Sequence, residues 1–374
     1  MTAKRLIEVY LPNSTVDRLT DALARYGDLY GDRSAFVNDA IENLLVRLAA
    51  REDDQRNRPR TTPNRFAPDE VAARVAVRTP VAGARTTSGI PVNPDAQPTF
   101  GLHNHDWPTL WAASELGRKP LNDDDAWSHS GPGTAAGGLP VDLAKWAIRL
   151  GDYAWDLAVA ASGTDIKLAQ SGFPSPRTQP DERLGPATDG TPEFDRTTMK
   201  RQRKDATNRF RTHFVGHASK RGALEGPLLA LHLVGIDPSD PKAVMLTPEG
   251  IDLLTELDGL MPSPDDPARP EHRRAFLAHL ARWAPADFAF LADLIRAIDS
   301  GTTQRSSLKD ALRERHRDPE GAGASTLSTN IAGFIARGRE WGLIDPKQGP
   351  GRVYLLTPDA VSAIETAERD RSTR

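Results

Sequence analysis

The segments Gly235-Ile-Asp-Pro238 and Val244-Met-Leu-Thr-Pro-Glu-Gly-Ile251 have near copies in Leu343-Ile-Asp-Pro346 and Val353-Tyr-Leu-Leu-Thr-Pro-Asp-Ala-Val361. The two Thr-Pro pairs are 110 residues apart. Each copy predicts a helix that ends at a glycine, a polar turn, a short β-strand and a new helix. Thr247 and Thr357 are suited to N-cap the new helix, with a proline at its first position and an acid in its first turn. The repetition indicates a duplicated module.

The block around the second copy has the periodicity of three helices, at residues 288–298, 307–315 and 326–341, followed by a hairpin over residues 343–356. This order resembles a winged helix-turn-helix over residues 275–368. The resemblance implies that the third helix is the recognition helix and that Arg352 touches phosphate from the wing. The outward residues of that helix are then Ser325, Ser328, Thr329, Asn330, Arg337 and Arg339. The alternative is a winged-helix module that binds protein or dimerises.

The strongest charge signal precedes the first copy. Between residues 196 and 221 one acid, Asp205, accompanies nine basic residues: Arg196, Lys200, Arg201, Arg203, Lys204, Arg209, Arg211, Lys220 and Arg221. Phe210, Phe214 and Ala218 are spaced as the inward stripe of a helix, which leaves the charges to its outer faces. Such a surface attracts a phosphate backbone. The alternatives are a solvated surface and a patch that faces an acidic part of the same chain.

The N-terminus predicts one strand, in which Ile7, Val9 and Leu11 alternate with polar or outward residues, and two short amphipathic helices that end near residue 50. The second helix has the broader apolar face, formed by Phe36, Val37, Ala40, Ile41, Leu44, Leu45 and Leu48. So small a unit cannot form a stable core alone. We therefore expect two copies to share one core as an intertwined homodimer.

This segment resembles the ribbon-helix-helix family (Arc, MetJ and CopG type) in Arg5-Leu-Ile-Glu-Val-Tyr-Leu-Pro12 and Gly31-Asp-Arg-Ser-Ala-Phe-Val-Asn-Asp-Ala-Ile41. The resemblance covers about residues 4–50. It implies a β-ribbon in the major groove and a phosphate at the start of the second helix. The residues concerned are Leu6, Glu8 and Tyr10, flanked by Lys4 and Arg5, and, for the phosphate, Arg33 and Ser34. The outward strand positions lack the family's usual Arg, Lys, Asn, Gln or Thr, so a ribbon that only dimerises is the alternative.

These patterns predict a mainly α fold with short β-strands, organised as an N-terminal ribbon-helix-helix, a flexible linker and tandem winged-helix modules. Residues 1–50 form the first domain, and the proline-rich residues 51–100 form a disordered linker. Residues 101–262 form a helical, tryptophan-rich region, with helices near 108–116 and 141–161, that leads into the first winged-helix-like module. Residues 263–374 form the second module.

The bulk composition excludes several classes of protein. The chain of 374 residues has no cysteine, which removes disulfides, thiolate zinc sites and cysteine nucleophiles and fits a reducing compartment. Neither a signal peptide nor a run of about 18 apolar residues is visible, so we expect no membrane partner and a cytoplasmic, nucleoid-associated protein. The net charge of −3 does not by itself suggest nucleic acid.

Candidate chemical sites are weak. The pairs His103/His105 and His213/His217 lack further metal ligands, and the glycine-rich residues 131–138 lack the ending of a phosphate loop. The dense tryptophans of the middle region predict core packing, with stacking on single-stranded bases as the alternative. No catalytic constellation can be assembled, so we expect no enzyme, no metal and no cofactor.

The sequence thus favours a sequence-specific double-stranded DNA-binding protein, and specifically a homodimeric transcriptional regulator. One alternative is a DNA-segregation or plasmid-maintenance adaptor that also recruits a protein partner. The other is a protein-interaction scaffold without DNA binding.

Overall fold

The computed structural model of the chain describes residues 71, 74–80, 82–93, 97–99, 101–117, 140–161, 196–219, 221–261, 267–313, 315–316, 324–346 and 353–372. All of them belong to one compact unit, Asn64–Arg374. The predicted ribbon-helix-helix segment, residues 1–50, lies outside the described residues, and so do its expected DNA contacts Lys4, Arg5, Glu8, Tyr10, Arg33 and Ser34.

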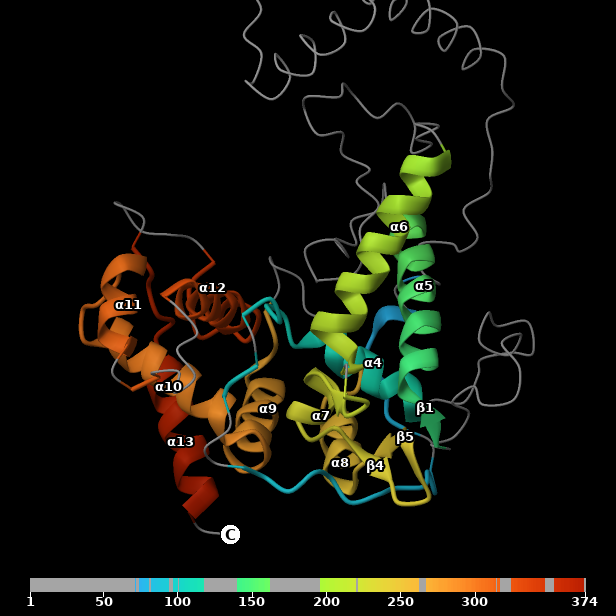
Figure 1. Cartoon of the computed structure of the whole chain (residues 1–374). Helices are drawn as coiled ribbons and strands as arrows, with labels where there is room; N and C mark the ends of the chain where they lie inside the picture. Colours follow the sequence, from blue (N-terminus) through green and yellow to red (C-terminus); the bar gives the residue numbers. More distant parts are fainter. Residues whose placement is uncertain are drawn as a thin grey trace, which may run out of the picture. The chain divides into compact units, whose positions relative to one another are not determined.

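The described part is mainly helical with short strands, which confirms the predicted class at that level (Figure 1). The elements, in chain order, are α4 (Trp107–Gly117), β1 (Val141–Asp142), α5 (Leu143–Ala161), α6 (Arg196–Phe210), the π-helix η2 (Arg211–Val215), β2 (His217–Ala218), β3 (Leu224–Glu225), α7 (Pro227–Ala230), β4 (Val234–Asp237), β5 (Asp240–Leu246), α8 (Pro248–Glu256), α9 (Pro270–Trp283), α10 (Pro285–Asp299), α11 (Arg305–Arg313), α12 (Ala324–Glu340) and α13 (Ala360–Ser372).

The first copy of the repeated sequence forms a hairpin of β4 and β5, and β1 pairs antiparallel with the other edge of β5. The sheet order is therefore β1-β5-β4 (Figure 1). Thr247 follows β5 and N-caps α8, because its hydroxyl accepts from the Gly250 amide at 2.9 Å. The strand, the cap, Pro248 at the first position and Glu249 in the first turn are confirmed.

The second copy has the same register as the first, offset by 110 residues. Val234 pairs with Leu246 in the first copy, and Ile344 bridges Leu356 in the second. The Thr247 hydroxyl donates to the carbonyl of His232, and the Thr357 hydroxyl donates to that of Gly342, each at 2.7 Å.

The third strand is repeated too. Val141 of β1 lies opposite Val244, and the amide of Tyr354, the residue offset from Val244 by 110, donates to the Thr303 carbonyl at 2.9 Å. His232 and Gly342, also 110 apart, both have positive φ, 57° and 64°. The predicted duplication is therefore confirmed at the level of hydrogen bonding.

Two details of the predicted repeat are wrong. Gly235 does not end a helix but lies within β4, where the Ser88 backbone packs against it. Thr357 does not cap a helix that starts at Pro358, because α13 starts only at Ala360. The intervening Asp359 is instead paired with Arg273 of α9.

The predicted helices of the C-terminal half are confirmed as α10, α11 and α12, and those of the middle region as α4 and α5. The helix predicted near 141–161, α5, has a stripe of buried residues at helical spacing: Leu143, Trp146, Ala147, Leu150, Ala154, Leu157 and Ala158. Trp107, Trp111, Trp146 and Trp155 are buried as well, as the core-packing interpretation predicts.

Part of the expected linker differs from the prediction. Val71, Val75 and Val77 are fully buried, and the Trp111 indole donates to the Arg74 carbonyl at 2.8 Å. The sparse apolar residues of this stretch need no core of their own, because they dock on one built by other elements. The segment is therefore ordered from Val71 onward wherever it is described.

The expected boundary between residues 262 and 263 does not separate two compact units. One hydrophobic core runs through both halves, and α9 packs against both α8 and α13. Among the described residues, no helix combines the length and the apolar character needed to cross a membrane.

The equivalent threonines provide a test of the repeat. Thr247→Val removes both the hydroxyl bond to His232 and the cap of α8, so we expect the free energy of unfolding to fall by about 1–3 kcal/mol. Thr357→Val removes the bond to Gly342 and longer ones to Leu343 and Asp359, but no helix cap, and we expect about 1 kcal/mol or less. Urea denaturation of both variants gives the comparison; equal losses would contradict the structural difference between the two copies.

Candidate functional site

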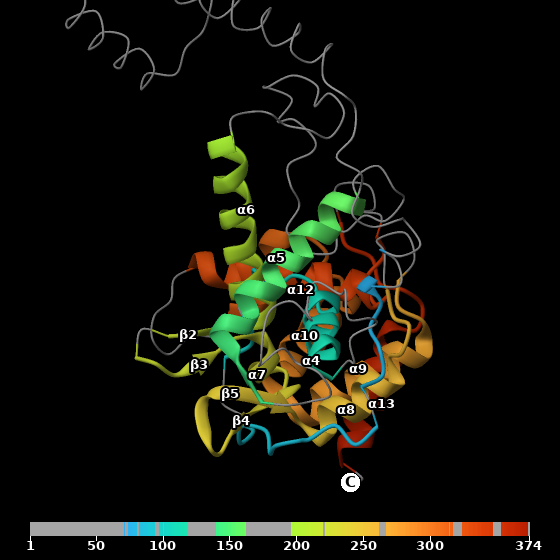
Figure 2. The same ribbon diagram turned by 90° about the vertical axis from the view of Figure 1, so that its right-hand side faces the viewer.

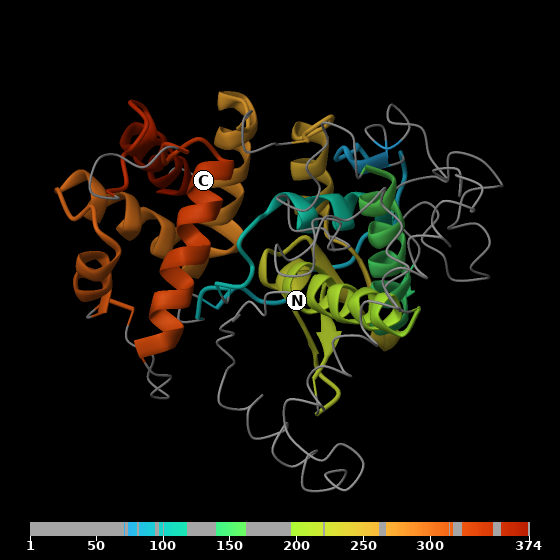
Figure 3. The same ribbon diagram turned by 90° about the horizontal axis from the view of Figure 1, so that it is seen from above.

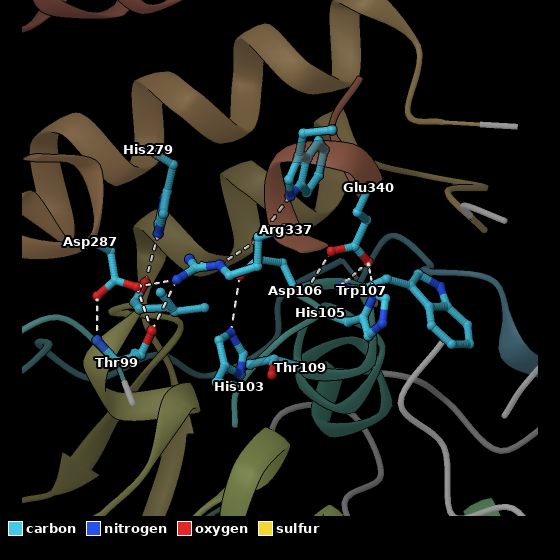
Figure 4. Close-up of polar contacts among 12 residues, drawn as sticks. Thr99, His103, His105, Asp106, Trp107, Thr109, His279, Asp287, Arg337 and Glu340 are labelled. Atoms are coloured by element: carbon cyan, nitrogen blue, oxygen red, sulfur yellow. Dashed lines mark hydrogen bonds and ion pairs between the residues drawn. The ribbon is translucent and has the colours of Figure 1, made fainter. Parts of the chain in front are cut away.

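The predicted recognition helix, α12, is covered on both sides. Its apolar side packs against α10 and α11, with the rings of Phe334 and Phe290 4.5 Å apart. Its polar side is covered by residues 97–99 and 101–107, which we call the crossing segment (Figure 4). Gly101 and Gly333 allow the backbones to touch, because a Cβ on Gly333 would lie 2.3 Å from the Gly101 carbonyl oxygen.

Arg337 is the centre of this contact and has no exposed surface. Its guanidinium pairs with Asp106 of the crossing segment through Nε and Nη2, both at 2.9 Å. Nη1 lies 2.5 Å from Asp287 of α10 and 3.0 Å from the hydroxyl of Thr99. One side chain of α12 thus joins the crossing segment to α10.

The remaining groups around Asp106 complete a buried network. The Trp341 indole donates to Asp106 Oδ2 at 2.9 Å, and His103 Nε2 lies 3.0 Å from Oδ1. The other ring nitrogen of His103 faces the His213 carbonyl at 2.8 Å. A doubly protonated His103 satisfies both acceptors, because it donates from both nitrogens.

Glu340 binds the start of α4. Its carboxyl accepts from the backbone amides of Asp106 at 2.6 Å and Trp107 at 3.0 Å. These are amides that a helix N-terminus leaves without partners. Glu340 therefore caps the start of α4 from a distant part of the chain.

The electrostatics follow from burial. Burial raises the pKa of Asp106, but the charge of Arg337 and the hydrogen bond from His103 outweigh it and hold that pKa well below its usual range. Burial and the neighbouring charge of Asp106 raise the pKa of Glu340 to about 8. Burial lowers the pKa of His105 to about 4. The network therefore places two carboxyl groups, of Asp106 and Asp287, around the guanidinium of Arg337.

This network acts as a structural clamp. Its ionised groups are paired with one another and buried. Within the described ranges, no group of three or more His, Asp or Glu side chains could hold a metal ion.

The basic run forms a different surface. Phe210 and Phe214 face inward as predicted, but Ala218 is exposed, because the helix ends at Val215 and Ala218 lies in β2. Lys204 and Arg209 of α6 are exposed. α6 packs against α5, and its N-terminal end extends beyond the other described elements in two views (Figures 1 and 2).

The rest of the basic run is divided between two other environments. Arg203 is anchored to Asp152 of α5, with Nε 2.9 Å from Oδ1, and Arg211 is half-buried. Arg221 is exposed at the turn between β2 and β3. Figure 3, which shows the molecule from above, shows that α6 crosses α5. Lys200 and Arg201 belong to α6, but their side chains lie outside the described set, as does Lys220.

Most of the α12 residues that were predicted to point outward are instead buried or half-buried. Arg337 is buried, and Asn330 is buried with its side-chain oxygen bound to the Gly101 amide at 2.8 Å. Ser328 and Thr329 are half-buried, and Ser328 accepts from Arg305. Arg339 is half-buried with its guanidinium 5.7 Å from the centre of the Tyr354 ring. Arg352 lies outside the described residues.

The sequence offered one signal for the clamp. His103, His105 and Asp106 are clustered polar residues directly before a helix rich in tryptophan, in a position where burial was predictable. Nothing in the spacing identified Arg337 and Glu340, more than 230 residues away, as their partners.

No protein-family model matches the chain, and neither the curated proteins nor the solved structures include a match. The case for function therefore rests on the geometry.

Removal of Arg337 tests the clamp. Arg337→Met leaves Asp106 and Asp287 buried without their cation, so we expect the free energy of unfolding to fall by about 3–5 kcal/mol. The control is Arg282→Met, an exposed arginine 4.7 Å above Trp283, with an expected loss of about 1 kcal/mol or less. Chemical denaturation of both variants is the measurement; similar small losses would show that the buried pairing is not a stabilising constraint.

Acid stability provides a second test. His279 donates to the Leu231 carbonyl at 2.8 Å, and burial lowers its pKa to about 4. Between that value and the ordinary value of 6.5 the unfolded chain binds the extra proton, so stability is lost as the pH falls through this window. We expect His279→Gln to remove about 2 kcal/mol of the difference in unfolding free energy between pH 7 and pH 4.5. An unchanged difference would contradict the assignment.

Proposed function

We propose that the protein is a homodimeric, sequence-specific double-stranded DNA-binding regulator whose described unit meets DNA through α6 and the β2–β3 turn. The observation that carries the proposal is the exposure of Lys204, Arg209 and Arg221 within a run of nine basic residues and one acid. A polyanion gains from such a surface by releasing its condensed counterions. The corresponding localisation is cytoplasmic, on the nucleoid.

The N-terminal segment has the second role in this proposal. A ribbon shared by two chains joins them, and its residues Lys4, Arg5, Glu8, Tyr10, Arg33 and Ser34 are the proposed additional contacts. Two linked basic surfaces raise the overall affinity, because the second surface binds at a high effective concentration once the first is bound. A DNA-segregation adaptor would use the same two contacts.

One observation favours a supporting role for the second module. Because α12 is covered on both sides, the second module fits a protein-interaction scaffold better than it fits a module that reads DNA. This observation supports proposed DNA contacts that lie outside α12.

The proposal is tested with the full-length protein and a fluorescent duplex of random sequence. We expect light scattering to give twice the chain mass of 40.8 kDa. We expect anisotropy to show binding that weakens about tenfold or more between about 50 and 200 mM salt, since each neutralised phosphate adds about 0.9 to the logarithmic slope. A monomer that ignores the duplex at the lower salt concentration would rule the proposal out.

A further inference from the structure

The last turn of α12 has its counterpart in α7. The amides of residues 231, 232 and 233 donate to the carbonyls of residues 227, 229 and 228, and the amides of residues 341, 342 and 343 donate to those of residues 337, 339 and 338. All three bonds repeat with the same offset of 110 residues. By this offset the rest of α12, residues 324–336, corresponds to residues 214–226 of the first repeat.

Residues 214–226 contain a β-hairpin where the second repeat has a helix (Figure 2). β2 pairs antiparallel with β3, with the exposed Ala218 opposite the buried Leu224, and the Gly222 amide closes the turn on the Ser219 carbonyl at 2.9 Å. Gly222 has a φ of 82°, and no described atom lies within 4 Å of the place that a Cβ would take there. The body of α12 is covered by the crossing segment, whereas the hairpin that stands in its place ends in an open turn.

The root of the hairpin is fixed in the unit. A Cβ on Gly226 would lie 2.3 Å from the Cα of Gly216, so the two strands leave the core through a close backbone contact. The Gly216 amide donates to the Arg211 carbonyl at 2.8 Å at the end of η2. η2 is held in turn by α4, because the Thr109 hydroxyl donates to the Phe214 carbonyl at 2.7 Å. The tip of the hairpin is therefore presented from a rigid base.

The side chains of the hairpin divide into short flanks and a long cation at the tip. Ala218 and Ala223 are exposed and offer no hydrogen-bonding group, and the exposed Glu225 is an acid. Arg221 is exposed at the tip and has no carboxylate partner among the described residues. Lys220 precedes it in the sequence. The exposed strand positions therefore lack the donors that reading guanine or adenine in the major groove requires, and the tip is the part suited to a polyanion.

A guanidinium on a tip of small residues suits the minor groove of A·T-rich DNA. That groove is about 6 Å wide, too narrow for a two-stranded ribbon but wide enough for one extended side chain. It is narrow in A-tracts, where an enhanced negative potential attracts inserted cations. An arginine enters such a groove more readily than a lysine, because a guanidinium is less strongly hydrated than an ammonium. A guanine would obstruct the same path with its amino group.

We infer that Arg221 is a minor-groove contact of this protein and that its ligand is a duplex with a narrow, A·T-rich minor groove. The inference rests on the proposed DNA binding and deepens it, because it names the class of duplex. Lys204 and Arg209 of α6 keep their proposed role against phosphates. The preference among duplexes comes from the hairpin, through the width and the potential of the groove.

The test uses the full-length protein and three fluorescent duplexes that differ only in a central tract of A·T, G·C or I·C pairs, where inosine replaces guanosine. Inosine lacks the amino group of guanine, so an I·C pair matches A·T in the minor groove and G·C in the major groove. Arg221→Lys keeps the charge and removes the guanidinium. Its control is Arg274→Lys, at an exposed arginine of α9. Melting temperatures show that each variant is folded.

We expect the wild type to bind the A·T and I·C duplexes with similar affinity and the G·C duplex about fivefold or more weakly. Arg221→Lys reduces the difference between the A·T and G·C duplexes to about twofold or less. Its binding to the G·C duplex stays within about twofold of the wild type, because the charge is retained. Arg274→Lys keeps the wild-type preference.

The results distinguish DNA binding itself from the role of the hairpin. If the wild type binds none of the three duplexes at low salt, the proposed function fails. If it binds all three equally, or treats the I·C duplex as it treats the G·C duplex, DNA binding stands and contact through the minor groove is overturned. If Arg221→Lys keeps the wild-type preference, or if Arg274→Lys loses it, the assignment of the contact to Arg221 is overturned.

Discussion

The pairing of Arg337 with Asp106 and Asp287 is the constraint on which the arrangement of the described unit depends. A buried guanidinium is tolerated only when its charge is compensated. Asp106 comes from the crossing segment and Asp287 from α10, so satisfying Arg337 brings three distant parts of the chain together. Glu340, one turn further along α12, adds the start of α4. The two halves of the unit therefore share one core.

The same constraint decides which surfaces are open to a partner. Since α12 uses Asn330, Arg337 and Glu340 to bind the crossing segment, these polar side chains are unavailable to any ligand. α6 uses buried small and aromatic residues on one side only and leaves its charged side open. Lys204 and Arg209 of α6 are therefore exposed, whereas Arg337 and Glu340 of α12 are buried.

Local sequence patterns predicted most of the helices and strands. Contacts between residues far apart in the chain account for the features that were not predicted. The Thr-Pro repeats, the stripe of α5 and the periodicity of α10 to α12 were sufficient, because each depends on neighbours within a few residues. The burial of Arg337 was not predictable, since an arginine in a polar ridge of a helix is outward unless distant carboxylates meet it. The ordered structure of the described residues between 71 and 99 was missed for a related reason, because valines that dock on a distant core leave no periodic pattern of their own.

Arg337 also fixes the position of α12 along its neighbours better than an apolar residue would. Apolar packing of similar volume could match its contribution to stability. However, an apolar helix face tolerates small shifts along its partner, whereas the planar guanidinium meets Asp106 with two nitrogens and Asp287 with the third. A shift of α12 by one residue would leave buried charges unpaired on both sides. The close approach of Gly101 to Gly333 adds a steric limit to the same movement. Together these contacts hold α12 in one position against the crossing segment and α10.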